Sequence, residues 1–320
     1  MISGPGRVLV AVAMALVPVV GPGLCRETVT LATETVAAWA DGRPLLVIVE
    51  DTLASDDQFA WVRAEERRAD AVIVIRWLRS CDRLQVVSIP RDLVLDAGGE
   101  PLTVVFGTAG RAGVEDAVRR AFGLDLFATV VLDLDDVRAL ARALGPVELR
   151  LAALSRDQRT GFTGGPGPVM LDADDTVAFL RSRTWEEQRA GEWVLTTDDD
   201  AGRIGREQAY IAAAMAAARH LSPAGTLRLA TALGRHGDIA VHDLAPIVGL
   251  LAGLRGAGNL ELDSVAVVDE RPDGDRLSPF LPGEVSAMHR SVLAPSGGDV
   301  FAAPGCAQPG PVRASEAVGR

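Results

Sequence analysis

Three apolar segments in the first third of the chain constrain its fold more than any other feature. They are PLLVIVE (44–50), ADAVIVIRW (69–77) and RLQVVSIP (83–90). Nearly continuous runs of Val, Ile and Leu are typical of strands that are buried on both faces of a sheet. The turn residues RSCD (79–82) predict that the second and third strands pair as a hairpin.

Further along the chain, helical and strand patterns alternate. We expect helices over 113–123, over 135–145, from about Arg203 to His220 and near 243–255, and strands over 127–134, 146–152, 176–183 and 260–268. Gly123 and Gly145 end two of these helices, as is common at helix C-termini. Strands that alternate with helices predict an α/β fold, in which a mixed sheet carries helices on both faces.

The charge balance limits the partners of the chain. Its 320 residues carry a formal net charge of −11, which argues against nonspecific binding to nucleic acid. No lysine occurs, so any anion site must use arginine guanidinium groups. The three cysteines are scattered and no histidine stands at metal-ligand spacing from them, which disfavours a zinc site. The sequence leaves open whether Cys81 and Cys306 form a disulfide.

The N-terminus predicts export. Residues 8–25 form an uncharged stretch of 18 residues between Arg7 and Arg26, which is typical of a membrane anchor or a cleaved signal segment. Positive charge before this stretch favours a cytoplasmic N-terminus, so the rest of the chain would lie outside the cell membrane. We therefore expect an anchor or signal segment (1–25), a short helical linker (26–43), one large domain (44–293) and a flexible tail rich in Pro, Gly, Ala and Ser (294–320).

Charged side chains gather where the predicted strands and helices begin or end. They are Asp51, Arg68, Asp70, Arg91 and Asp92, and later Arg181, Arg183, Arg203 and Arg206. On an extended backbone Arg181 and Arg183 would face one side, whereas Arg203 and Arg206 would share a face in the first turn of a helix. In open α/β sheets, ligands bind where the strands end. Many arginines beside two carboxylates suit a phosphate or pyrophosphate with a divalent cation.

The order of these motifs resembles the LytR–CpsA–Psr family of cell-wall glycopolymer transferases. The matching stretches are LLVIVEDT (45–52), RADAVIVI (68–75), VVSIPRDLVL (86–95), FATVVLDLDDVRALARALGPVEL (127–149), LDADDTVAFLRSR (171–183) and DAGRIGREQAYI (200–211). The specific parts are SIPRD and the pair FLRSR and GRIGREQ. The resemblance implies a three-layer α/β/α sandwich with a central mixed β-sheet, and an N-terminal membrane anchor.

The resemblance also implies an activity at the outer side of the cytoplasmic membrane, the transfer of a phosphate-linked glycopolymer from a polyprenyl-pyrophosphate carrier to peptidoglycan. The pyrophosphate would be bound by Arg68, Arg91, Arg181, Arg183, Arg203 and Arg206, and Mg²⁺ or Mn²⁺ by Asp51 and Asp70. The catalytic residues would be Asp70, Arg91 and Asp92, with Asp70 or Asp92 as general base. The polyprenyl chain would occupy an apolar tunnel inside the domain.

The sequence departs from the family pattern at several positions. Val49 and Glu50 stand before Asp51 where a glycine is usual, PLTVVFG (101–107) replaces a Lys-Ile-Asn-Ala segment, and Glu207 replaces a glutamine. A negative side chain at 207 would be unfavourable beside an anionic ligand unless it turns away or binds a metal ion. Three alternatives stay open, namely a transferase with reduced activity, a non-catalytic protein that binds polyprenyl phosphate or glycopolymer, and a prenyl-pyrophosphate pyrophosphatase.

Overall fold

The computed structural model describes residues 43–51, 67–78, 82–95, 99–197, 200–236, 259–265, 267–270, 290–293 and 301. The predicted anchor or signal segment (1–25), the helix predicted near 243–255, Cys81 and Cys306 lie outside the described residues, as does nearly all of the tail (294–320). Among the helices that are described, none is long and apolar enough to cross a membrane.

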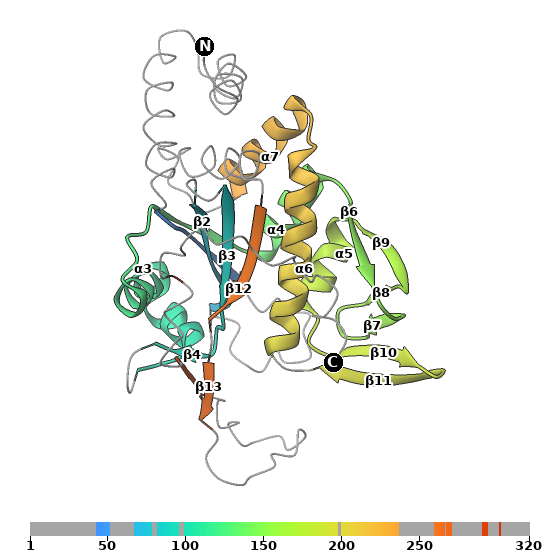
Figure 1. The fold of residues 1–320 in the computed structure, drawn as a ribbon, viewed down its shortest axis with the longest axis horizontal. Coiled ribbons are helices and arrows are strands. Elements are labelled where there is room, and N and C mark those ends of the chain that lie inside the picture. The colour runs from blue at the N-terminus through green and yellow to red at the C-terminus, as the bar shows by residue number, and fades with distance from the viewer. Residues whose placement is uncertain are drawn as a thin grey trace.

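A five-stranded mixed sheet forms the centre of the molecule (Figure 1). Its strands, in spatial order, are β12 (Asn259–Ser264), β3 (Arg83–Ile89), β2 (Arg68–Leu78), β1 (Leu45–Asp51) and β5 (Ala128–Leu132). β2 is antiparallel to both β1 and β3, whereas β5 is parallel to β1 and β12 is parallel to β3. The predicted hairpin is confirmed, since Ile75 of β2 pairs with Val86 of β3.

Helices cover both faces of this sheet, which confirms the predicted three-layer α/β/α sandwich (Figure 1). α3 (Leu102–Phe122) packs on one face, where Phe106 joins the core that contains Ile48. α4 (Leu134–Leu144), α6 (Asp200–Arg219) and α7 (Pro223–His236) lie on the other face. Because successive strand residues point to opposite sides, Val47 of β1 packs into this second core while Ile48 packs into the first.

The segment 176–183 is mostly helical, so the strand predicted there is wrong. α5 (Ala173–Arg181) begins after Asp172, whose side chain accepts hydrogen bonds from the backbone N–H groups of Asp174 and Asp175, both at 2.9 Å. An aspartate in this position caps the free N–H groups of a helix start. The apolar residues that follow, such as Val177 and Phe179, are buried on one side of the helix and gave the appearance of a strand.

Two other elements differ from the prediction in their extent. α3 reaches back to Leu102, well before the predicted start at 113, and is interrupted at Gly110, whose φ of 60° is one that glycine adopts readily. The strand predicted over 260–268 is split into β12 and β13 (Val267–Glu270), which belong to different sheets.

Three smaller sheets complete the fold. They are the pair β6 (Val147–Leu151) and β9 (Gly167–Leu171), the four strands β7 (Ser155–Asp157), β8 (Phe162–Gly164), β10 (Trp185–Arg189) and β11 (Glu192–Thr197), and the set β4 (Leu93–Val94), β13 and β14 (Arg290–Leu293). Phe162, Phe179 and Trp185 pack with ring centres 5.2–5.6 Å apart. This cluster fixes the end of α5 against the start of β10, and the segment between them carries Arg183.

Candidate functional site

A β-bulge places Asp70 at the edge of the central sheet. Val49 of β1 pairs with Ala71 of β2, and Glu50 pairs with Ala69, so Asp70 is an extra residue in β2. Successive residues of a regular strand face opposite sides, yet Asp70 and Ala71 line the same cavity. The bulge therefore turns Asp70 towards the layer of α4, α6 and α7, as bulges near functional sites commonly do.

Three arginines from separate elements converge on Asp70. Arg91, which follows β3, donates to Asp70 Oδ1 at 2.5 Å, and Arg183, which follows α5, donates to Oδ2 at 2.8 Å. Arg203, in the first turn of α6, donates to the backbone carbonyl of Asp70. Burial would raise the pKa of Asp70, but the charges of Arg183, Arg91 and Arg203 lower this pKa below its ordinary value. Asp70 is therefore a carboxylate at neutral pH and holds the arginines together.

Glu207 belongs to the same cluster. Its Oε1 lies 2.9 Å from a terminal nitrogen of Arg203, one helical turn earlier, and the two side chains are only 10% and 5% exposed. The sequence predicted that Glu207 would be unfavourable here unless it turned away or bound a metal ion. The structure gives a different arrangement, in which Arg203 neutralises Glu207 within the buried part of the site.

An apolar cavity of about 290 Å³ opens behind these charges. Its apolar walls come from the central sheet and from α4, α5, α6 and α7, and include Leu45, Val47, Val49, Ile73, Leu132, Leu140, Leu180, Ile211 and Met215. Its charged lining residues are Asp70, Arg181, Arg183, Arg203 and Glu207, at the end where β2 begins. From Val49 to Leu45 the cavity follows β1 for about 13 Å, at the usual rise of a strand. This shape suits a ligand with an anionic head and an apolar tail.

The other predicted site residues take different places. Arg181 lines the cavity as the last residue of α5, so the prediction that it shares an extended segment with Arg183 is wrong. Asp92 Oδ2 lies 3.6 Å from Arg91 Nε. Arg68 begins β2 and pairs through the backbone with Asp51, the last residue of β1, whose side chain lies outside the described part of the structure.

Arg206 lies beneath the site. Its side chain is buried, donates to the backbone carbonyl of Ser182 at 2.7 Å, and has its guanidinium carbon 5.0 Å from the centre of a Trp185 ring. It is not among the residues that line the described cavity. In this arrangement Arg206 supports the segment that carries Arg183.

Asp157, at the end of β7, was missed by the sequence analysis. Its side chain is completely buried and accepts hydrogen bonds from the backbone or side chains of Arg159, Thr160, Ser182, Arg183 and Thr184. Burial would raise the pKa of Asp157, but the hydrogen bonds from Ser182 and Thr184 lower this pKa below its ordinary value. The only sequence signal was an Asp three residues before Thr160-Gly161, which predicts a local turn and says nothing of partners 25 or more residues away.

The charge cluster is compatible with a divalent cation that a bound phosphate helps to hold. Within the described residues, no group of three or more His, Cys, Asp or Glu could hold a metal ion. Mg²⁺, however, is commonly bound by one or two carboxylates together with substrate phosphates. Asp70 is ionised and lines the cavity, and each carboxylate oxygen has two lone pairs, of which an arginine uses one.

The chain matches one protein family and is similar to several solved structures. The model of the LytR_cpsA_psr family matches residues 45–236, whereas a search of curated proteins gave no match. Among solved structures, the LytR-Csp2A-Psr enzyme from Actinomyces oris is similar with a TM-score of 0.61 and 20% identity, over 82% of this chain and 89% of that one. TagT bound to LIIa-WTA has a TM-score of 0.57 and 15% identity, again over 82% and 89%. Bacillus subtilis TagV has a TM-score of 0.54 and 13% identity, over 81% and 94%.

These structural likenesses show a shared fold, and the family match goes further. It covers more than half of the chain and runs from β1 to the end of α7. This stretch contains Asp70, its three arginines, Asp157 and the walls of the apolar cavity. The chain therefore belongs to the LytR–CpsA–Psr family of cell-wall glycopolymer transferases.

Proposed function

We propose that this protein is an extracytoplasmic phosphotransferase that moves a phosphate-linked glycopolymer from a polyprenyl-pyrophosphate carrier to peptidoglycan. One observation carries the proposal, namely that arginines gather around Asp70 at the charged end of an otherwise apolar cavity. A polyprenyl pyrophosphate has the same division into an anionic head and an apolar tail. The similarity to TagT, whose structure holds a wall teichoic acid ligand, supports a glycopolymer as the transferred group.

The arrangement suits phosphoryl transfer by charge neutralisation and positioning. A sugar hydroxyl of the acceptor attacks the phosphorus that carries the glycopolymer, the bond from this phosphorus to the bridging oxygen breaks, and polyprenyl phosphate leaves. Arg91 and Arg183 bind the phosphate oxygens, where charge-assisted bonds from guanidinium groups offset the negative charge of the transition state. The side chain of Arg183 is 46% exposed, so it is the arginine that reaches an incoming headgroup most directly.

Asp92 is the better candidate for the general base. Both oxygens of Asp70 accept hydrogen bonds from arginines and its pKa is lowered, so Asp70 is a weak proton acceptor. Asp92 is 31% exposed and lies next to Arg91, where it can take the proton of an acceptor hydroxyl that approaches from outside. A divalent cation held by Asp70, with Asp51 as the second predicted ligand, would add positive charge beside the pyrophosphate.

The test is a transfer assay with the purified full chain in detergent. The chain is incubated with Mg²⁺ and a polyprenyl-pyrophosphate oligosaccharide, with and without peptidoglycan fragments. We expect a phosphodiester product on the peptidoglycan together with polyprenyl phosphate, in an acceptor-dependent manner. Release of polyprenyl phosphate without acceptor would instead indicate a pyrophosphatase, and retention of the lipid without turnover would indicate a binding protein.

A pair of variants connects the outcome to the site. Arg183→Gln removes the positive charge that pairs with Asp70 and should weaken donor binding by about 1.5–3 kcal/mol, as expected for a charge-assisted hydrogen bond. Arg150→Gln removes an exposed arginine of β6 and should leave donor binding unchanged. Equal effects of the two substitutions would place the headgroup elsewhere.

A further inference from the structure

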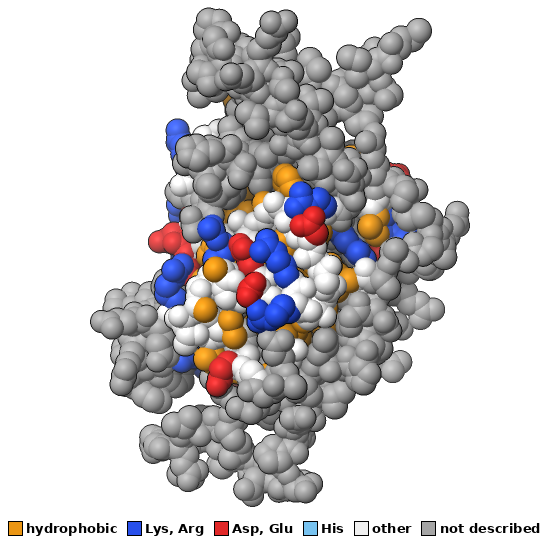
Figure 2. All heavy atoms as spheres, turned by 90° about the vertical axis from the view of Figure 1, so that its left-hand side faces the viewer, with side chains coloured by type: hydrophobic (Ala, Val, Ile, Leu, Met, Phe, Trp, Pro, Cys, Tyr) orange, Lys and Arg blue, Asp and Glu red, His pale blue; other side chains and the backbone are white. Residues whose placement is uncertain are grey.

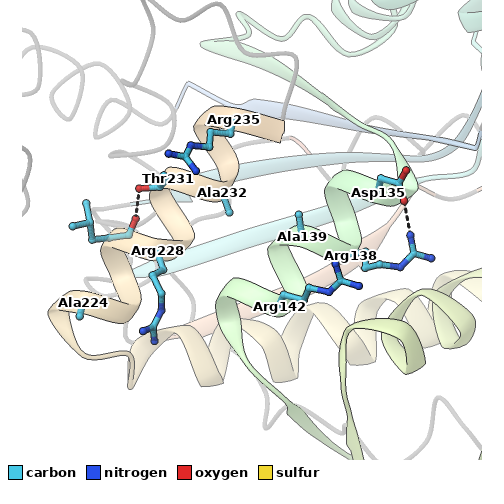
Figure 3. Close-up of a pocket in the computed structure, with 10 residues that line it drawn as sticks. Asp135, Arg138, Ala139, Arg142, Ala224, Arg228, Thr231, Ala232 and Arg235 are labelled. Carbon is cyan, nitrogen blue, oxygen red and sulfur yellow. Dashed lines mark hydrogen bonds and ion pairs between the residues drawn. The ribbon is translucent and has the colours of Figure 1, made fainter. Parts of the chain in front are cut away.

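α4 and α7 form a groove that is separate from the apolar cavity (Figure 3). Its volume is about 810 Å³, and its lining includes four arginines but only one aspartate, Asp135. The arginines are Arg138 and Arg142 of α4 and Arg228 and Arg235 of α7. Between them lie small or apolar residues, among them Ala139 and Ala232, which face the space between the two helices.

The α7 side of this groove is the more strongly positive. On α4, Arg138 pairs with Asp135 and lies 2.8 Å from Asp174, and Arg142 lies 3.8 Å from the same aspartate. Arg228 and Arg235 are exposed, and neither forms an ion pair within the part of the chain that the structure describes. Seven residues apart, they share one face of α7. The chain as a whole carries a net charge of −11, but charges more than about 8 Å away are largely screened at physiological salt. The groove therefore keeps a local positive field.

The same two helices form the wall of the apolar cavity. Leu140 and Leu144 of α4, and Leu229 and Leu233 of α7, point inwards and line the cavity, while the arginines lie on the outer faces. α6 carries Arg203 at its start and runs away from Asp70 to Arg219, so α7, which follows it, begins at the end of the central sheet that is far from the charge cluster (Figure 1). α4 begins nearer the cluster, two residues after Leu132 of β5, which pairs with Val49. β1 also begins at this end, where Leu45 pairs with Ile75.

We propose that the α4–α7 groove binds the headgroups of anionic phospholipids. This binding would hold the apolar end of the cavity, the end far from Asp70, against the bilayer. The inference rests on the proposed function, because a carrier lipid must pass its tail between the bilayer and the cavity. Arginines around an apolar floor suit an amphiphile that has both a phosphate and the start of an acyl chain, whereas a free anion would use only the arginines. In this orientation the charge cluster at Asp70 points away from the membrane, towards the acceptor.

The experiment uses the full chain in phosphatidylcholine nanodiscs that contain a small fraction of photoreactive phosphatidylglycerol. After irradiation, labelled peptides are identified by mass spectrometry. We expect labelling within 134–144 and 223–236. Arg228→Gln with Arg235→Gln should reduce this labelling on the order of tenfold, because each arginine near an anionic surface contributes appreciably to binding. Excess phosphatidylglycerol should compete, and inorganic phosphate at the same concentration should not.

A charge-matched control comes from α3, on the opposite face of the sheet. Arg119 and Arg120 are exposed there but lie in ion pairs with Glu115 and Asp116, and blue and red side chains stand side by side on this face (Figure 2). Arg119→Gln with Arg120→Gln changes the net charge equally and should leave the labelling unchanged. An equal loss with both double variants, equal labelling by photoreactive phosphatidylcholine, or displacement by inorganic phosphate would each overturn the proposal. The transfer assay runs in detergent, without a bilayer, so the groove variants should retain transfer activity in it. If the groove is labelled by the lipid but the protein shows no transfer activity, only the proposed function is refuted.

Discussion

Replacing Asp157 by asparagine should weaken the site, although Asp157 does not itself line the cavity. One oxygen of Asp157 accepts from Ser182, Arg183 and Thr184, and the other accepts from Arg159, Thr160 and the Thr184 hydroxyl. An asparagine places an N–H₂ group against one of these sets in either orientation, so two backbone N–H groups lose their acceptor. A buried donor without a partner costs about 1–3 kcal/mol. The free energy of unfolding should therefore fall by roughly 2–6 kcal/mol.

Urea unfolding followed by tryptophan fluorescence measures this loss, since Trp185 packs beside the segment. Donor affinity should fall as well, because Asp157 binds the backbone N–H of Arg183, which pairs with Asp70. The matched control is Asp172→Asn at the other end of α5, where the side chain accepts from two backbone N–H groups at the surface. Asparagine caps helices about as well as aspartate, so this change should cost only tenths of a kcal/mol.

A double-variant cycle decides whether Asp157 acts through Arg183. If it does, Asp157→Asn should weaken donor binding in the wild-type background and have little further effect once Arg183→Gln is present, because coupled residues are non-additive. Equal losses in both backgrounds would show that Asp157 acts on the fold alone, and unchanged affinity in Asp157→Asn would refute the positioning role.

Three further predictions test the cluster and the cavity. The pKa values of Asp70 and Asp157 are lowered in the folded chain. The stability that these carboxylates contribute is therefore complete above their ordinary pKa near 4 and is lost as the pH falls below it. In unfolding measurements between about pH 5 and 2.5, Asp157→Asn should make the free energy of unfolding fall less steeply with decreasing pH. Glu207→Gln keeps an oxygen for Arg203 but removes a negative charge, so donor titrations should show severalfold tighter binding. Unfolding measurements should show a free energy of unfolding lower by about 1–2 kcal/mol. Weaker donor binding would contradict this account of the Arg203–Glu207 pair. Ala214→Trp fills part of the apolar cavity, so it should weaken the binding of long-tailed donors more than that of a short-tailed analogue. The melting temperature checks that the variant is folded. Equal losses of affinity for the two donors would mean that the tail binds elsewhere.

The central sheet was predictable because its strands are buried on both faces and therefore carry little polar sequence. PLLVIVE became β1 within one residue at each end. The short strands around Asp157 were not predictable, since Ser155–Asp157 and Phe162–Gly164 are three residues each and depend on packing against Trp185 from a distant part of the chain. α5 had a usable signal in Asp172 and the two aspartates that follow, which cap a helix, and the apolar residues after them obscured it.

The residue types of the site were predictable, but their grouping was not. Arginines and aspartates at the ends of strands indicated an anion site. Asp70 faces the cavity because β2 contains an extra residue at the bulge. This bulge can be recognised only when the pairing of β1 with β2 is known. The partners of Arg206 could not be predicted either, because they are a backbone carbonyl and an aromatic ring outside its own helix.

The acidic residues at the charged end of the cavity explain how a site whose positive groups are all arginines can hold them together before a ligand binds. Neighbouring guanidinium groups repel one another, and Asp70 and Glu207 offset that repulsion while holding Arg91 and Arg203 in place. An arginine that is already fixed loses little of the roughly 2 kcal/mol of side-chain entropy that ordering it would otherwise cost. Arg91 and Arg203 are 16% and 5% exposed, whereas Arg183 is 46% exposed and holds Asp70 through one nitrogen. Under the proposed function, a phosphate at the charged end of the cavity would find Arg91 and Arg203 already fixed beside Asp70, and Arg183, the most exposed of the three, could turn from Asp70 to the ligand.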